Sequence, residues 1–233
     1  EGSPESLAAE ALSYVRAGNT ALAEAFIARL DRTAFEATPG RKALLLSLQG
    51  KVAMQRMRRL DALRFFEAAY DAEPSERHLL PRAEVRFLFA VDSGDKVAIE
   101  EISQSLAAAV SDDGLALRVR LHVSVGQFAL AQTCVDRIGA PKQLMPRLVL
   151  LSGRGRWREV RTLAEHAAAT PGISIQDVVA TQLVAARACW QQALSTATVA
   201  PDALELPLTG APGLDSEAAL AAWGLSEACL QGL

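Results

Sequence analysis

The sequence predicts an all-α fold, and three observations support this. Half of the 233 residues are hydrophobic but only 5% are aromatic, which suits closely packed helices better than a β-sheet. Apolar residues recur at helical spacing in five stretches along the chain. Small residues, namely Gly50, Ala62 and Ala69, stand where two antiparallel helices would approach most closely. Each observation is typical of paired helices.

The overall composition excludes several classes of protein. The chain is long enough to bury a large core, as one extended domain or as one to two compact ones. A net charge of −3 and a pI near 5.7 argue against a nucleic-acid binder, which normally has a strong basic excess. No run of about 18 apolar residues occurs, so we expect no membrane span.

Five stretches place an apolar stripe on one helical face. The stripes are Ala23, Ile27 and Leu30; Ala62, Phe66 and Ala69; Ala98, Ile102 and Leu106; Ala131, Val135 and Ile138; and Val160, Ala164 and Ala167. Their first residues are separated by 39, 36, 33 and 29 positions. The third stripe also fits a register shifted by one residue. A glycine is expected in the turn before every stripe except the second, at Gly18, Gly94, Gly126 and Gly155.

Each stripe has a possible helical partner before it in the chain. The partners are expected in residues 5–17, 41–57, 79–91, 114–125 and 143–153. Pro81 and Pro146 fall near the starts of two of them, where the first-turn N–H groups have no intrahelical acceptor and proline is tolerated. The sequence therefore predicts five helical hairpins over residues 4–172.

The pattern changes after residue 172. Residues 173–198 read as one long additional helix, with Ser174 as its candidate cap. Residues 199–213 contain three prolines and are expected to form a connecting segment. Residues 214–233 are expected to form a helix whose apolar side includes Trp223 and Leu230. This last helix is interpreted as a cap on the final hairpin, and the alternative is that it mimics a ligand.

The stretch from Gly50 to Pro74 resembles one tetratricopeptide repeat. Gly50, Ala62, Phe66, Ala69 and Pro74 stand at the spacing of that family, whose repeat is roughly 34 residues long. The resemblance extends over residues 4–172, although no repeat has the family's first-helix tryptophan. It implies a right-handed superhelical solenoid of helical hairpins, closed by the C-terminal capping helix.

The resemblance also implies a function. Proteins of this family hold other proteins, and their first helices line a concave groove. Carried over by position, the residues facing a partner would be Arg16, Lys51, Met54, Gln55, Arg86, Arg120, Val123, Ser124, Lys142, Met145 and Val149. This basic and apolar groove would suit an acidic peptide or extended segment. The alternatives are that this face is only solvated, or that another face binds.

Motifs for chemistry are absent from the sequence. It contains no nucleotide-binding loop, zinc-protease motif or nucleophile elbow, and the glycines and arginines of residues 152–157 are interpreted as a turn rather than a phosphate site. Cys134, Cys189 and Cys229 show no metal-ligand spacing and are interpreted as buried thiols. We therefore expect no enzyme activity, no metal and no cofactor.

The histidines are given structural roles. His122 is expected between helices with its ring nitrogens satisfied locally, His166 is expected in solvent or at a cap, and His78 is expected in the loop before Pro81. A general base needs a partner within hydrogen-bonding distance, and no local spacing supplies one.

The leading hypothesis is thus a protein-interaction scaffold: an adaptor, a chaperone or an assembly factor. One alternative is a regulatory or sensor domain excised from a larger signalling or transcription protein, and a remote one is a helical-solenoid enzyme. The chain begins without Met or a signal pattern, so it is interpreted as a piece of a longer protein. The use of Ala, Leu and Arg is bacterial-like. A cytoplasmic location is favoured, and a periplasmic one stays open if a signal or anchor has been removed.

Overall fold

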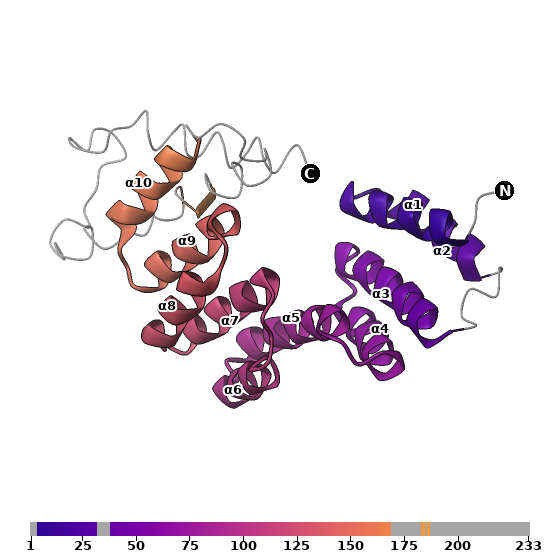
Figure 1. The fold of residues 1–233 in the computed structure, drawn as a ribbon, viewed down its shortest axis with the longest axis horizontal. Helices are drawn as coiled ribbons and strands as arrows, with labels where there is room; N and C mark the ends of the chain where they lie inside the picture. The colour runs from indigo at the N-terminus through magenta and orange to yellow at the C-terminus, as the bar shows by residue number, and fades with distance from the viewer. Residues whose placement is uncertain (1–3, 32–37, 169–182, 185, 187–233) are drawn as a thin grey trace, which may run out of the picture. The chain divides into compact units, whose positions relative to one another are not determined.

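The computed structural model describes residues 4–31, 38–168, 183, 184 and 186. Ten α-helices and no strand occur in these ranges, which confirms the all-α class (Figure 1). Their bounds are α1 Pro4–Arg16, α2 Thr20–Asp31, α3 Pro39–Gln55, α4 Arg59–Ala72, α5 Glu76–Ser93, α6 Lys96–Ser105, α7 Asp112–Ser124, α8 Phe128–Arg137, α9 Leu144–Gly153 and α10 Trp157–Ala168. None of these described helices is long and apolar enough to cross a membrane.

The chain divides into two units, Glu1–Ile138 and Gly139–Leu233, called the N-terminal and C-terminal units below. In the N-terminal unit α1 packs against α2, α3 against α4, α5 against α6, and α7 against α8. Further contacts join each pair to the next, including α2 with α3, α4 with α5 and α6 with α7. The principal contacts of this unit therefore join helices that are close in sequence.

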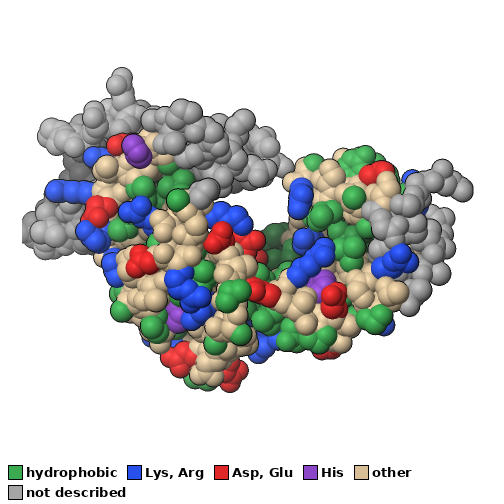
Figure 2. Space-filling view, viewed as in Figure 1, with side chains coloured by type: hydrophobic (Ala, Val, Ile, Leu, Met, Phe, Trp, Pro, Cys, Tyr) green, Lys and Arg blue, Asp and Glu red, His purple; other side chains and the backbone are tan. Residues whose placement is uncertain are grey.

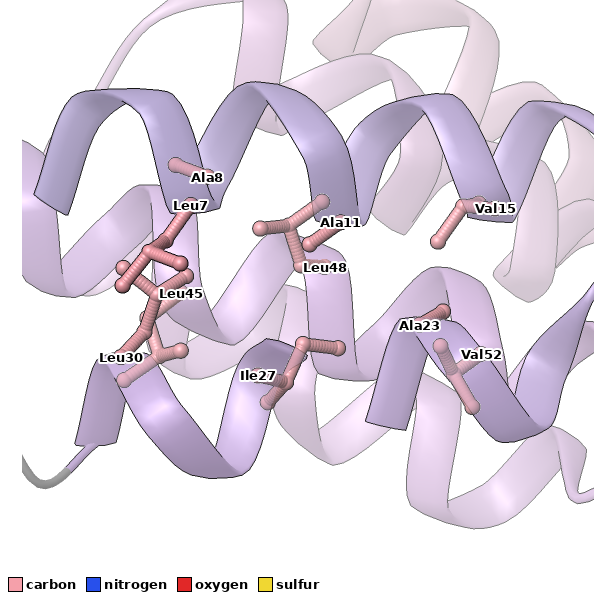
Figure 3. Close-up of a cluster of buried hydrophobic side chains, with 10 residues drawn as sticks. All are labelled: Leu7, Ala8, Ala11, Val15, Ala23, Ile27, Leu30, Leu45, Leu48 and Val52. Carbon is pink, nitrogen blue, oxygen red and sulfur yellow. The ribbon is translucent and has the colours of Figure 1, made fainter. Parts of the chain in front are cut away.

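The core of the N-terminal unit is built from the predicted stripes. Figure 3 shows the first cluster, in which side chains of α1, α2 and α3 converge. Its members are Leu7, Ala8, Ala11 and Val15 of α1, Ala23, Ile27 and Leu30 of α2, and Leu45, Leu48 and Val52 of α3. The stripes on α4 and α8 are also fully buried, as predicted.

The third stripe differs from the prediction only at its first position. Ile102 and Leu106 are buried as expected, but the position that opens the stripe is Ile99, because Ala98 is only half-buried. The larger side chain fills the space between α5 and α6, where it joins the cluster that includes Phe87 and Leu121.

One prediction about proline is wrong. The helix expected at 79–91 begins at Glu76, so Pro81 lies inside α5 rather than near its start. Ser75 takes an extended N-cap conformation, and its carbonyl accepts hydrogen bonds from the backbone N–H groups of His78 and Leu79. These bonds start the helix directly after Pro74. Pro146, in contrast, lies near the start of α9, as predicted.

The turns inside the helix pairs share one backbone conformation. Gly18, Gly94, Gly126 and Gly155 have φ between 68° and 77°, in the left-handed region that glycine enters without a steric penalty. The turn between α3 and α4 has Met57 in this region, with φ of 59°. Its side chain is 73% exposed, so packing does not offset the strain.

We expect Met57→Gly to stabilise the protein by about 1 kcal/mol, because it removes the left-handed penalty of a side chain that contacts little. Chemical denaturation would measure the gain. Met57→Ala is the matched control and should gain little, since alanine keeps the penalty. Gly94→Ala should have the opposite effect, because nothing lies within 4 Å of the added Cβ and only the backbone is strained. Equal stability of all four proteins would contradict this account.

The C-terminal unit is described over α9, α10 and a short 3-10 turn at Ala140–Lys142. Leu148 and Val160 form its buried centre, and Met145, Leu151 and Trp157 pack around them. Ala164 and Ala167 are buried as well, so the fifth stripe faces inward as predicted. The expected long helix at 173–198 lies outside the described residues apart from positions 183, 184 and 186. The connecting segment 199–213 and the capping helix 214–233 lie wholly outside them.

Candidate functional site

The residues predicted to face a partner fall into both units. Arg16, Lys51, Met54, Gln55, Arg86, Arg120, Val123 and Ser124 belong to the N-terminal unit, and Lys142, Met145 and Val149 belong to the C-terminal unit. The structure brings two of them together on neighbouring helices: Arg16, at the end of α1, and Lys51, on α3, are close enough to interact electrostatically. The Gln55 amide, one turn after Lys51, donates a hydrogen bond to the Val15 carbonyl and so ties the ends of α3 and α1 together.

Other predicted residues are engaged within the protein. Arg120 on α7 forms an ion pair with Glu84 of α5, with 2.7 Å between Nη1 and Oε1, and its guanidinium lies over the Phe87 ring. Ser124 donates its hydroxyl proton to the Leu121 carbonyl. These side chains already have partners. Arg86, Val123, Met145 and Val149 are half-buried, and Lys142 is exposed.

A third cation, Arg77, joins Arg16 and Lys51 and was missed by the sequence prediction. Arg77 is the second residue of α5, and its positive charge lowers the pKa of Lys51. Arg16, Lys51 and Arg77 are called the basic cluster below. Figure 2 shows Lys and Arg side chains gathered over the part of the N-terminal unit where α1, α3 and the beginning of α5 lie.

The basic cluster has no acidic partner in the part of the chain that the structure describes. Lys51 is half-buried, and its pKa is lowered, first by burial and then by the positive charges of Arg77 and Arg16. Some other arginines of this unit form ion pairs with acidic side chains: Arg56 binds Glu24 at 2.6 Å and Arg59 binds Asp92. The basic cluster therefore concentrates repulsive positive charge at a place where an anion would be stabilised.

A small pocket opens beside the cluster. Its lining combines apolar walls with a hydroxyl and two cations, and consists of Leu12, Leu44, Ser47, Leu48, Lys51, Arg77 and Pro81. Residues from α1, α3 and α5 meet here. Helix α3 contacts α1 directly, and it is joined to α5 by the hydrogen bond between Ser47 and His78.

Below the pocket, His78 connects three helices. Its Nδ1 lies 2.8 Å from the Ser47 hydroxyl of α3, and its Nε2 lies 3.3 Å from a carboxylate oxygen of Glu73, the residue after α4. His78 is only 2% exposed. The prediction of a loop position for His78 is wrong because α5 begins at Glu76, which places the imidazole on a helix that faces α3.

The pKa of His78 is lowered, chiefly because burial disfavours the charged imidazolium. Glu73 opposes this change by its hydrogen bond and its charge, while Arg77 and Lys51 add to it. A serine hydroxyl, an imidazole and a carboxylate can also form a nucleophile with its base. Here Ser47 and His78 are both buried, and the Ser47 hydroxyl is bonded to the imidazole. The arrangement is therefore described as a buried link between helices.

The remaining polar candidates lie away from this cluster. His122 is buried as expected and its Nδ1 lies 2.8 Å from the Gln127 side-chain oxygen. Its Nε2 has no hydrogen-bond partner among the described residues, so the expectation that both nitrogens are satisfied is wrong. His166 is exposed on α10. Cys134 is a buried thiol as predicted, and burial raises its pKa; Cys189 and Cys229 lie outside the described residues. In the described ranges no three potential metal ligands come together.

Comparison of the chain with protein-family models, with curated proteins and with solved structures found no match.

Proposed function

We propose that the protein is an interaction scaffold that binds an acidic peptide or an extended acidic segment of a partner at the basic cluster. The observation that carries this proposal is the convergence of Arg16, Lys51 and Arg77, without an acidic partner among the described residues, at a pocket with apolar walls. The resemblance to tetratricopeptide repeats adds to it, because such repeats bind protein segments through their first helices.

The electrostatics of the cluster favour such a ligand. Bringing two arginines close to a half-buried lysine costs free energy in the absence of a ligand. A carboxylate that enters the cluster removes this repulsion and gains charge-assisted hydrogen bonds with the ammonium and guanidinium groups. The leucine walls beside Lys51 can contact an apolar side chain of the same segment. Charge and shape therefore select a segment that is acidic and partly apolar.

The proposal predicts that Lys51→Glu weakens peptide binding by about tenfold or more, because a charge reversal replaces attraction with repulsion at the centre of the cluster. Random peptides displayed on phage would be selected on the immobilised protein, and the affinity of the best acidic peptide would be measured by fluorescence anisotropy. The binding of the wild type should also weaken with salt, since partly exposed charges are screened.

Arg64→Glu is the matched control, because it makes the same change in net charge. The Arg64 side chain is 81% exposed on α4 and contacts Asp61 at 4.0 Å. This variant should bind the acidic peptide nearly as well as the wild type. If the two reversals weaken binding equally, or if neither does, the basic cluster is not the binding site.

A further inference from the structure

We propose that one anionic group of the ligand binds in the pocket between Ser47, Lys51 and Arg77, and that its binding is coupled to the protonation of His78. This inference rests on the proposed function because it uses the same basic cluster. It adds the position at which a charged group of the ligand binds, and it adds a dependence of that binding on pH. Ser47 lines the pocket and its hydroxyl bonds His78, so this residue connects the ligand site to the buried imidazole.

When His78 is neutral, its hydrogen-bond partners determine which of its ring nitrogens carries the proton. A carboxylate can only accept, so the Nε2 that faces Glu73 carries the proton. Nδ1 is then an acceptor, and the hydroxyl of Ser47 must donate its proton to it. In this state the Ser47 proton points at the imidazole and is not available to an anion in the pocket.

Protonation of His78 reverses the bond between these two residues. Both ring nitrogens of an imidazolium are donors, so Nδ1–H donates to Ser47 Oγ and the hydroxyl proton is released. That proton can then be donated to an anion held by Lys51 and Arg77, which line the same pocket. The one bond that forms is the Nδ1–H bond of the imidazolium, and its proton comes from solvent.

The charges around His78 make the coupling favourable. Among the described residues, Glu73, which follows α4, is the acidic group that acts on the imidazole, whereas Lys51 of α3 and Arg77 of α5 act against its protonation. Arg16 of α1 adds positive charge next to Lys51. An anion bound to the two cations cancels much of their repulsion. Protonation of His78 and binding of the anion therefore favour each other.

The sign of the pH dependence follows. The anion raises the pKa of His78, so its affinity is lower at pH 8 and rises as the pH falls through the pKa range of His78. Each unit by which the bound anion raises that pKa corresponds to about tenfold tighter binding of the anion at the lower pH.

The test is an NMR titration of the whole chain, whose three histidines are His78, His122 and His166. Imidazole resonances would be followed from pH 8 to pH 5 in sodium sulfate and in sodium chloride at equal ionic strength. Sulfate is the probe because it keeps its charge over this range. We expect sulfate to raise the pKa of His78.

Two further measurements decide the outcome. In the Lys51→Gln variant, sulfate and chloride should give the same pKa for His78, because the anion has lost a main contact. If sulfate shifts amide resonances around Lys51 and Arg77 in the wild type but the pKa of His78 stays the same, the coupling is wrong and the proposed function stands. If sulfate changes neither, no anion binds in this pocket and the inference fails. The proposed function is then judged separately by the comparison of the Lys51→Glu and Arg64→Glu variants.

Discussion

Replacing Gly50 by leucine is expected to lower the free energy of unfolding by about 1–3 kcal/mol, because α3 and α4 approach too closely to hold a side chain there. A Cβ atom at this position would lie 2.5 Å from Cε1 of Phe66 and 2.8 Å from its Cδ1. The Phe66 ring cannot move easily, since it is buried in a cluster with Ala53, Ala62 and Val85.

Alanine at Gly50 gives the sharper experiment. Gly50 lies inside a helix, where alanine is intrinsically better than glycine by about 1 kcal/mol. A net loss of stability in Gly50→Ala, measured by urea denaturation, would therefore report the contact with Phe66 directly. A gain would show that the two helices are not in close contact at this point.

Two further variants test the same helix contact. Ala62→Leu places extra volume at a fully buried position of α4 and should also destabilise the protein, by about 1–3 kcal/mol. Ala68→Leu is the matched control on the same helix, because Ala68 is exposed, and it should change stability by less than about 0.5 kcal/mol. In a Gly50→Ala, Phe66→Leu double variant the losses should not add, since the smaller side chain leaves room for the Cβ.

Acidification from pH 8 to pH 5 is expected to destabilise the protein through His78. The folded pKa of this residue lies below that of the unfolded chain, so unfolding takes up a proton. The full stability is present above the unfolded value of about 6.5 and is lost as the pH falls towards the folded value. The loss is about 1.4 kcal/mol for each pH unit between the two values. Urea denaturation at several pH values would measure it.

His78→Gln should remove most of this pH dependence, although the variant starts from a lower stability because Ser47 and Glu73 lose their present partner. His166→Gln is the control, because His166 is exposed on α10 and should leave the pH profile close to that of the wild type. A profile of His78→Gln that matches the wild type would show that another group causes the acid sensitivity.

The helices were predictable because their signals are local. Ala62, Phe66 and Ala69 repeat at helical spacing within one stretch, and all three are buried. The first residue of the third stripe was harder to predict, because Ala98 and Ile99 are adjacent and both apolar. Only the space between α5 and α6 decides that Ile99 fills it. The strained turn at Met57 was visible in the sequence only as a missing glycine.

The candidate site was predicted in part. Arg16 and Lys51 were expected to face a partner because the resemblance to tetratricopeptide repeats implies that first helices do so. Arg77 and His78 were missed because Pro81 was taken as the start of its helix, so α5 was expected three residues too late. The bond between Ser47 and His78 spans 31 positions. Such a contact depends on how α3 and α5 pack, and a one-dimensional pattern does not contain that information.

Helices that pack together in the N-terminal unit are also close in the sequence. This affects how the chain folds during synthesis. In the N-terminal unit each helix finds its main partner a short turn away, so little loop-closure entropy opposes the contact. A nascent chain can complete α1 with α2 while α5 is still inside the ribosome, and each new pair then adds to a surface that already exists. His78 belongs to α5 but closes a contact with α3, so the anion pocket is completed only after α5 has emerged.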